Sequence, residues 1–109
     1  MKQYTTPDQT AKLIELGFEK PKMAAPSLKW VDGEPTFEPQ YTIGELLSFL
    51  PKSIKVNDLV FKLCIHSNIV SWIVEYADIA FGTQARLYKE ELIDALFAEI
   101  VILKEEGVI

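Results

Sequence analysis

The stretch Leu59–Tyr76, LVFKLCIHSNIVSWIVEY, decides the fold of this chain. It contains two runs rich in β-branched and aromatic residues, 59–65 and 69–76, which flank the polar tripeptide 66–68. Two such runs around a short polar break are typical of antiparallel strands joined by a turn. We therefore expect a central β-hairpin over 59–65 and 69–76.

The alternation of side chains along these strands predicts the register of the hairpin. Whether the turn takes residues 67–68 or 66–69, the larger apolar side chains share one face. Their pairs are Ile65 with Val70, Leu63 with Trp72, Phe61 with Val74, and Leu59 with Tyr76. A slip by one residue would place Trp72 opposite Lys62 or Cys64 and mix the faces, which a half-buried sheet resists.

A second, shorter hairpin is expected over 28–31 and 34–37. The dipeptide Asp32-Gly33 between these runs suits a tight turn that needs positive φ at both central positions. Pro35 and Pro39 cannot donate hydrogen bonds to a neighbouring strand. We therefore expect this hairpin at the edge of the sheet or as a flap.

Two capping boxes predict the starts of two helices. Thr6 is followed three residues later by Gln9, and Thr42 is followed by Glu45 at the same spacing. The first helix should run to about residue 16 and end at Gly17, and the second should be a short helix that ends before residue 51, a proline.

A third helix is expected over 87–106, where apolar residues recur with a helical period up to Gly107. These residues cover an arc of about 180°, so the helix needs cover from two sides. The preceding segment, 77–86, shows no clean period, and we expect a loop there.

Length and composition indicate one globular domain. The chain has 109 residues, of which 49% are hydrophobic and 25% charged. We predict a single α+β domain over 1–109, in which a small antiparallel sheet packs with an N-terminal helix, a short middle helix and a long C-terminal helix. The single cysteine and the polar N-terminus without an apolar targeting segment favour a cytoplasmic protein.

Three runs of the chain resemble a known group of proteins. They are TTPDQTAKLIELGF (5–18), YTIGELLSFLP (41–51) and EELIDALFAEIVILKEEGVI (90–109). They are similar to runs in a group of small uncharacterised proteins from prophages and other mobile elements of gut bacteria. The resemblance covers most of the chain and implies a phage or mobile-element accessory protein, but it carries no catalytic residue, ligand or activity to any position.

No residue pattern indicates catalysis, a metal site or a cofactor. His66 is the only histidine and Cys64 the only cysteine. A cysteine nucleophile also needs an orienting group and an oxyanion hole, which no pattern signals. We interpret His66 as a turn residue and Cys64 as a packing residue, and we expect no cofactor and no enzymatic activity.

Ile102 is a candidate for partner contact. Helical spacing places it nearly opposite the core-facing Ile93, among acidic residues and close to Ala95 and Ala98. One interpretation is a partner or self-association face with Ile102 as its anchor. The other is an isolated exposed apolar residue, or one that segment 77–86 covers.

Trp30, Phe37 and Tyr41 form a second candidate set. Aromatic residues near a proline-rich loop often anchor a binding partner. They can equally close one end of a small core, and we favour the core interpretation.

Charge and hydropathy limit the class of partner. The net charge is −5 and the lysines are scattered singly, so we expect no nucleic acid as partner, and no apolar run is long enough for a membrane. We expect a protein partner or a second copy of this chain in a homodimer. The alternative is an acidic inhibitor or nucleic-acid mimic that blocks a basic cleft of a host enzyme, because 89–106 holds six acids and two lysines, a net of −4.

Overall fold

The structure is a computed structural model that describes residues 2–21, 24–78 and 82–109, with the backbone alone for 24–31 and 34–39. The described residues form three helices and six strands. The helices are α1 (Pro7–Glu15), α2 (Ile43–Phe49) and α3 (Leu92–Glu105). The strands are β1 (Ala24–Val31), β2 (Glu34–Pro39), β3 (Ser53–Val56), β4 (Leu59–Ser67), β5 (Trp72–Asp78) and β6 (Gly82–Lys89).

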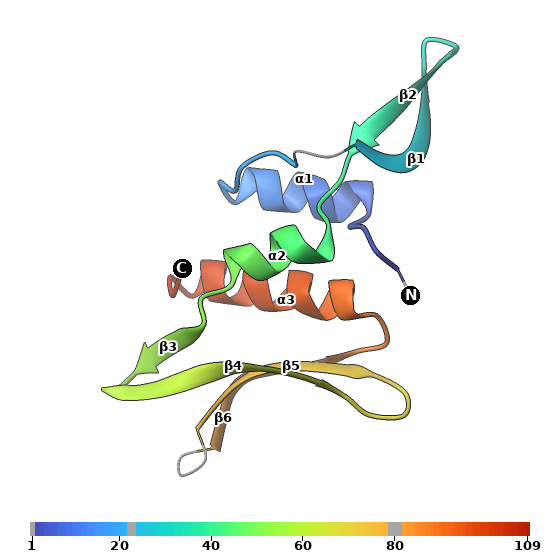
Figure 1. Ribbon diagram of the computed structural model, residues 1–109. Helices are drawn as coiled ribbons and strands as arrows, with labels where there is room; N and C mark the ends of the chain where they lie inside the picture. Colours follow the sequence, from blue (N-terminus) through green and yellow to red (C-terminus); the bar gives the residue numbers. More distant parts are fainter. Residues whose placement is uncertain (1, 22–23, 79–81) are drawn as a thin grey trace.

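Strands β3 to β6 form an antiparallel sheet in the order β3-β4-β5-β6. Figure 1 shows the helices layered above one face of this sheet, with α3 nearest to it, then α2, then α1. The β1–β2 hairpin projects from the body beyond α1, which makes the molecule 57 Å long. The predicted α+β class, with three helices packed on an antiparallel sheet, is confirmed.

The core fills the space between α3 and the inner face of the sheet. β4 and β5 contribute the fully or almost fully buried Phe61, Val74 and Tyr76. The wide apolar arc of α3 meets this face on one side and α2 on the other, as the sequence predicts. Its buried apolar residues are Leu92, Ile93, Ala95, Leu96, Ile100 and Leu103.

Both capping boxes are confirmed. The Thr6 hydroxyl accepts from the amide of Gln9 at 3.1 Å, and the Gln9 side chain accepts from the amide of Thr6 at 2.9 Å. Thr42 and Glu45 form the same reciprocal pair at the start of α2. At the end of α1, Gly17 has φ +98°, the left-handed conformation that glycine adopts without a steric cost.

The short hairpin has the predicted register, in which Leu28 pairs with Phe37 and Val31 with Glu34. Asp32 and Gly33 both have positive φ, as the predicted turn requires. Of the two places expected for it, the edge of the sheet is wrong, and the flap agrees with the hairpin that projects from the body in Figure 1. β1 and β2 form a separate two-stranded sheet that begins at Ala24, so the hairpin is not an edge of the main sheet.

The register of the central hairpin was also predicted wrongly. Leu63 pairs with Tyr76 and Ile65 with Val74, so the pairing is displaced although each residue keeps its predicted face. The reason is the turn, which takes residues 68–71. The Asn68 carboxamide oxygen accepts from the amides of Val70 and Ser71 at 2.9 and 2.7 Å, and this moves the turn toward the second strand.

Two edge strands were not predicted. β3 is a short strand joined to β4 by Asn57 and Asp58, which both have positive φ. β6 occupies much of 77–86, which we expected to be a loop, and residues 79–81 of that segment lie outside the described residues. A bulge where Ala85 has φ +52° interrupts the alternation of side chains that would mark β6 as a strand.

The last helix begins later than predicted. Residues 87–89 belong to β6, and α3 starts at Leu92. The N-cap residue, Glu91, makes no side-chain capping bond, so the sequence contains no start signal there. The predicted start at Leu87 therefore placed the last three residues of β6 and the two residues after them in the helix.

Candidate protein-binding groove

A groove of about 470 Å³ lies between the C-terminal end of α3, the β3–β4 turn and the bulge of β6. β3 and β6 are the two edge strands of the sheet, so the sheet curves enough to bring both of its edges to one groove. The groove is lined by Ile54, Lys55, Val56, Asn57, Gln84, Ala85, Ile102, Leu103, Glu106 and Val108. We call this site the Ile102 groove.

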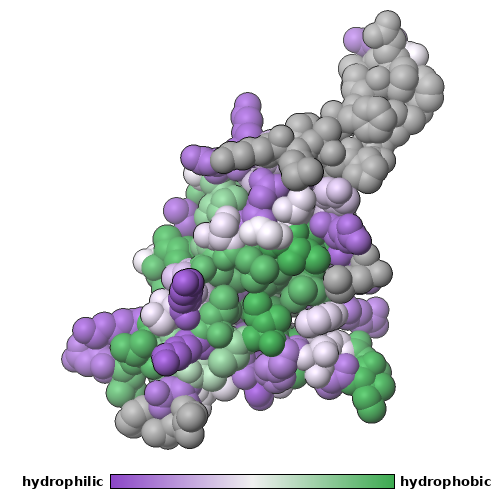
Figure 2. All heavy atoms as spheres, in the orientation of Figure 1, coloured by the Kyte–Doolittle hydropathy of each residue, from purple (hydrophilic) through white to green (hydrophobic). Residues whose placement is uncertain are grey.

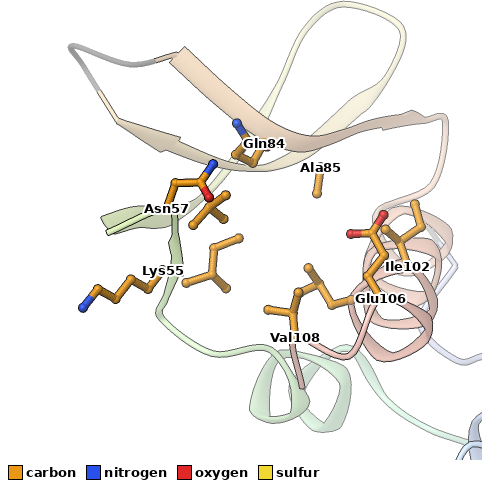
Figure 3. A pocket seen from close by; sticks show the side chains of 10 residues that line it. Lys55, Asn57, Gln84, Ala85, Ile102, Glu106 and Val108 are labelled. Carbon is orange, nitrogen blue, oxygen red and sulfur yellow. The ribbon is translucent and has the colours of Figure 1, made fainter. Parts of the chain in front are cut away.

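The side chains of the Ile102 groove separate into an apolar floor and a polar rim. The apolar members are Ile54, Val56, Ala85, Ile102, Leu103 and Val108. Figure 3 shows the Glu106 carboxylate directed into the groove, whereas the Lys55 ammonium points away from it. The groove therefore offers an apolar surface with one carboxylate at its margin.

The turn of the chain at the end of α3 brings Val108 against Leu103, and both residues belong to the floor of the groove. Gly107 has φ +75° and turns the chain back, and the amide of Val108 donates to the carbonyl of Leu103 at 2.9 Å. The amide of Gly107 donates to the carbonyl of Lys104 at 3.2 Å. This pair of bonds is a Schellman motif, which brings the residue after the glycine against the last turn of the helix.

Glu99 lies two turns before Glu106 on the same face of α3. It is 0% exposed, and neither carboxylate oxygen has a hydrogen-bond partner among the described residues. Burial, with a smaller contribution from the charge of Glu106, raises the pKa of Glu99 to about 8. At neutral pH this carboxyl is therefore mostly protonated, which avoids an unpaired charge in the core.

The structure separates the residues that the sequence grouped around Ile102. Ile102 is half-buried and lines the groove, where Gln84 and Ala85 of β6 lie beside it. Ala98 is half-buried as well, but Ala95 is 0% exposed and belongs to the core, which contradicts its place in a contact face. Of segment 77–86, the described residues Gln84 and Ala85 thus border Ile102 in the groove.

Tyr41 belongs to the core, as the favoured interpretation held. It is 0% exposed, and its hydroxyl donates to the backbone carbonyl of Glu19. Its ring packs edge-on against Phe49 with the centroids 5.4 Å apart. The side chains of Trp30 and Phe37 lie outside the described part of the structure.

Two acidic residues of α3, Asp94 and Glu105, form ion pairs with lysines of the same chain. Asp94 accepts from the Lys2 ammonium at 2.7 Å and from the Gln9 carboxamide at 2.8 Å. Burial would raise the pKa of Asp94, but these two hydrogen bonds outweigh it and hold the pKa below its usual value. Glu105 lies 3.6 Å from the Lys12 ammonium. The charge that suggested an acidic mimic is thus partly neutralised by the N-terminal segment.

An ionic cluster on the outer face of the sheet was not predicted. Glu75 on β5 is almost completely buried, and its carboxylate accepts from Arg86 on β6 and lies 3.2 Å from the His66 ring on β4. His66 is therefore a strand residue opposite Ile73, and its predicted place in the turn is wrong. Burial raises the pKa of Glu75, but the hydrogen bonds from Arg86 and His66 outweigh it and lower the pKa overall.

The outer face of the sheet also carries Cys64. Cys64 is half-buried, and its thiol lies 3.6 Å from the backbone carbonyl of Lys62. Across residues 2–21, 24–78 and 82–109, no three His, Cys, Asp or Glu side chains gather as metal ligands. None of the helices found in these ranges has the length and apolar character needed to cross a bilayer.

Comparisons with protein-family models, with curated proteins and with solved structures gave no match. The resemblance to mobile-element proteins therefore stays a prediction. The function must be inferred from the geometry of the chain itself.

Proposed function

We propose that this chain is a non-enzymatic protein-interaction module that binds an apolar segment of a protein partner in the Ile102 groove. The observation that carries the proposal is the groove itself, in which apolar side chains from three parts of the chain form one floor inside a polar rim. An apolar centre within a polar margin is the usual composition of a protein interface.

The chemistry of the rim favours a protein segment over a small substrate. A small-molecule site usually holds several converging polar groups within an enclosed pocket. Here the polar members, Lys55, Asn57, Gln84 and Glu106, are all exposed, and Lys55 points away. Such a site can accept apolar side chains but has little with which to orient reacting atoms.

The proposed biological setting is that of a small accessory protein of a phage or mobile element. This part of the proposal is supported by the resemblance of the runs 5–18, 41–51 and 90–109. Such a setting is compatible with a binding role, because binding a partner requires no catalytic residue.

A selection from displayed peptides tests the proposed function. Random dodecapeptides displayed on phage are selected on the wild-type chain, and the Kd of the strongest synthetic peptides is measured by calorimetry. We expect peptides with an apolar anchor, and we expect Ile102→Glu to weaken them by about 10-fold or more, since truncated anchors often cost over 1.4 kcal/mol.

Two further variants make this test specific. Ile14→Glu is the matched control, because Ile14 is an α1 residue of the same type, 37% exposed and absent from the groove lining. Val108→Glu is a second groove variant at a 40% exposed position, where a charge should not disturb folding. Peptides that bind all variants equally, or a selection that enriches none, would contradict the proposal.

A further inference from the structure

The turn between β4 and β5 carries two apolar side chains at its tip. Ile69 is 100% exposed and Val70 is 75% exposed. Figure 2 shows hydrophobic atoms at the end of the sheet where Figure 1 places this turn. Turn tips usually hold small or polar residues, so two adjacent β-branched apolar residues there point to an interaction site.

This turn is held in one conformation. The carboxamide oxygen of Asn68 accepts from the amides of Val70 and Ser71 and from the Ser71 hydroxyl, the last at 3.0 Å. The amide of Asn68 in turn donates to the carbonyl of Ser71 at 3.0 Å. Because the turn is already ordered, binding through Ile69 and Val70 loses little conformational entropy.

We propose that the Ile69–Val70 turn of one copy inserts into the Ile102 groove of a second copy. This inference rests on the proposed function, in which the groove accepts an apolar protein segment, and it names the occupant. The seven side-chain carbons of one isoleucine and one valine take roughly 210 Å³ if each occupies about as much space as a water molecule, roughly 30 Å³, and the groove of about 470 Å³ can therefore hold them.

Charge also suits this occupant. Residues 67–71 carry no ionisable side chain, so the turn brings no like charge to Lys55 or to Glu106 at the rim. The nearest charged residue that shares a surface hollow with the turn is Glu90. Its charge is opposite to that of Lys55 and the same as that of Glu106, so the two rim charges act on it in opposite directions.

The positions of turn and groove require two copies for the contact. The groove lies at the β3–β4 end of the sheet and the turn at the other end of β4, which is nine residues or roughly 30 Å away. A turn therefore cannot reach the groove of its own copy. The turn of one copy therefore enters the groove of another copy, either in a two-fold pair in which the contact forms twice or in a head-to-tail chain or ring.

Sedimentation velocity tests this inference on the full chain. A contact of this small size should be weak, so the wild type is measured from about 10 µM to about 1 mM. We expect its sedimentation coefficient to rise with concentration, whereas Ile102→Glu and the double variant Ile69→Asp/Val70→Asp should stay monomeric. A wild type that is monomeric at the highest concentration overturns the inference, as does a variant that assembles like the wild type.

The decisive experiment is a mixture of the Ile102→Glu variant with the Ile69→Asp/Val70→Asp variant. The Ile102→Glu copy retains its turn and the Ile69→Asp/Val70→Asp copy retains its groove, so an equimolar mixture should form heterodimers and nothing larger. A mixture that stays monomeric would overturn the insertion of the turn into the groove. Val108→Glu should behave like Ile102→Glu, while Ile14→Glu should assemble like the wild type.

The two proposals can fail separately. If dodecapeptides bind the groove but the chain is monomeric throughout, the proposed function holds and the second copy is not the occupant. If the variants and their mixture behave as expected, the turn is an occupant of the groove, whatever the peptide selection yields.

Discussion

Glu99 and Glu106 lie on the same face of α3, and the charge of the exposed Glu106 adds to the burial that keeps Glu99 protonated. Glu99 has no hydrogen-bond partner within the described part of the chain, so its ionisation would leave a bare charge in the core. The core around Glu99 is therefore sensitive to pH.

This relationship predicts that stability falls as the solution becomes alkaline. The pKa of Glu99 is about 8 in the folded chain against an ordinary 4.5, so the folded state holds a proton that the unfolded state releases. The stabilisation is complete below about pH 4.5 and is lost between there and pH 8. By linkage the loss is on the order of 4 kcal/mol.

Urea unfolding at pH 5 and pH 8 measures this effect. Glu99→Leu should remove most of the difference between the two pH values, whereas Glu90→Gln at an exposed position should leave it unchanged. Glu106→Gln should reduce the difference slightly, because it removes the smaller cause of the shift. Equal pH dependence in wild type and Glu99→Leu would show that Glu99 is ionised in the folded state.

The cluster on the outer face of the sheet predicts the opposite pH trend. The lowered pKa of Glu75 means that its stabilising contribution is present above pH 4.5 and is lost as pH falls through the folded pKa. Arg86→Ala removes the main partner of this buried carboxylate and should destabilise the chain at pH 7.

Denaturant unfolding of Arg86→Ala should therefore show a deficit at pH 7 that shrinks under acidic conditions. Lys62→Ala, a change at an exposed position on the same face, is the control and should have little effect at either pH. A deficit of the same size at pH 7 and at pH 3 would mean that Arg86 acts by packing and not through its ion pair.

Two glycines should respond to the same substitution with opposite signs. Gly107→Ala forces a side chain into φ +75° and should destabilise the chain by about 1 kcal/mol. Gly44→Ala, within α2, places its Cβ 3.8 Å from the Thr42 hydroxyl, an ordinary contact, and should stabilise by about 0.5 kcal/mol. Thermal unfolding compares the two, and a stabilised Gly107→Ala would refute the Schellman motif as the element that places Val108.

The elements that were predicted correctly have local signals. Thr6 and Thr42 specify their helices through bonds to residues three positions away, and the turn at 32–33 needs only its own two residues. The edge strands lack such signals, since β3 is short and the bulge at Ala85 interrupts β6. Sheet edges depend on tertiary contacts that no local pattern encodes.

Ile102 is the only residue of the groove that could be predicted from the sequence. Ile102 could be found because the helical period places it away from the core-facing side of α3. Its partners in the groove come from β3, β6 and the residues after α3, and only the folded chain brings these together. The outer cluster escaped detection for the same reason, because His66, Glu75 and Arg86 lie on three different strands.

The most direct test of the central claim is to map where a selected peptide binds. Amide chemical shifts of the wild-type chain are followed by NMR while the strongest dodecapeptide is added. The largest changes should fall on 54–57, 84–85 and 102–108, the segments that form the Ile102 groove. Changes concentrated instead on the β1–β2 hairpin or on the outer face around residue 64 would contradict the groove as the binding site.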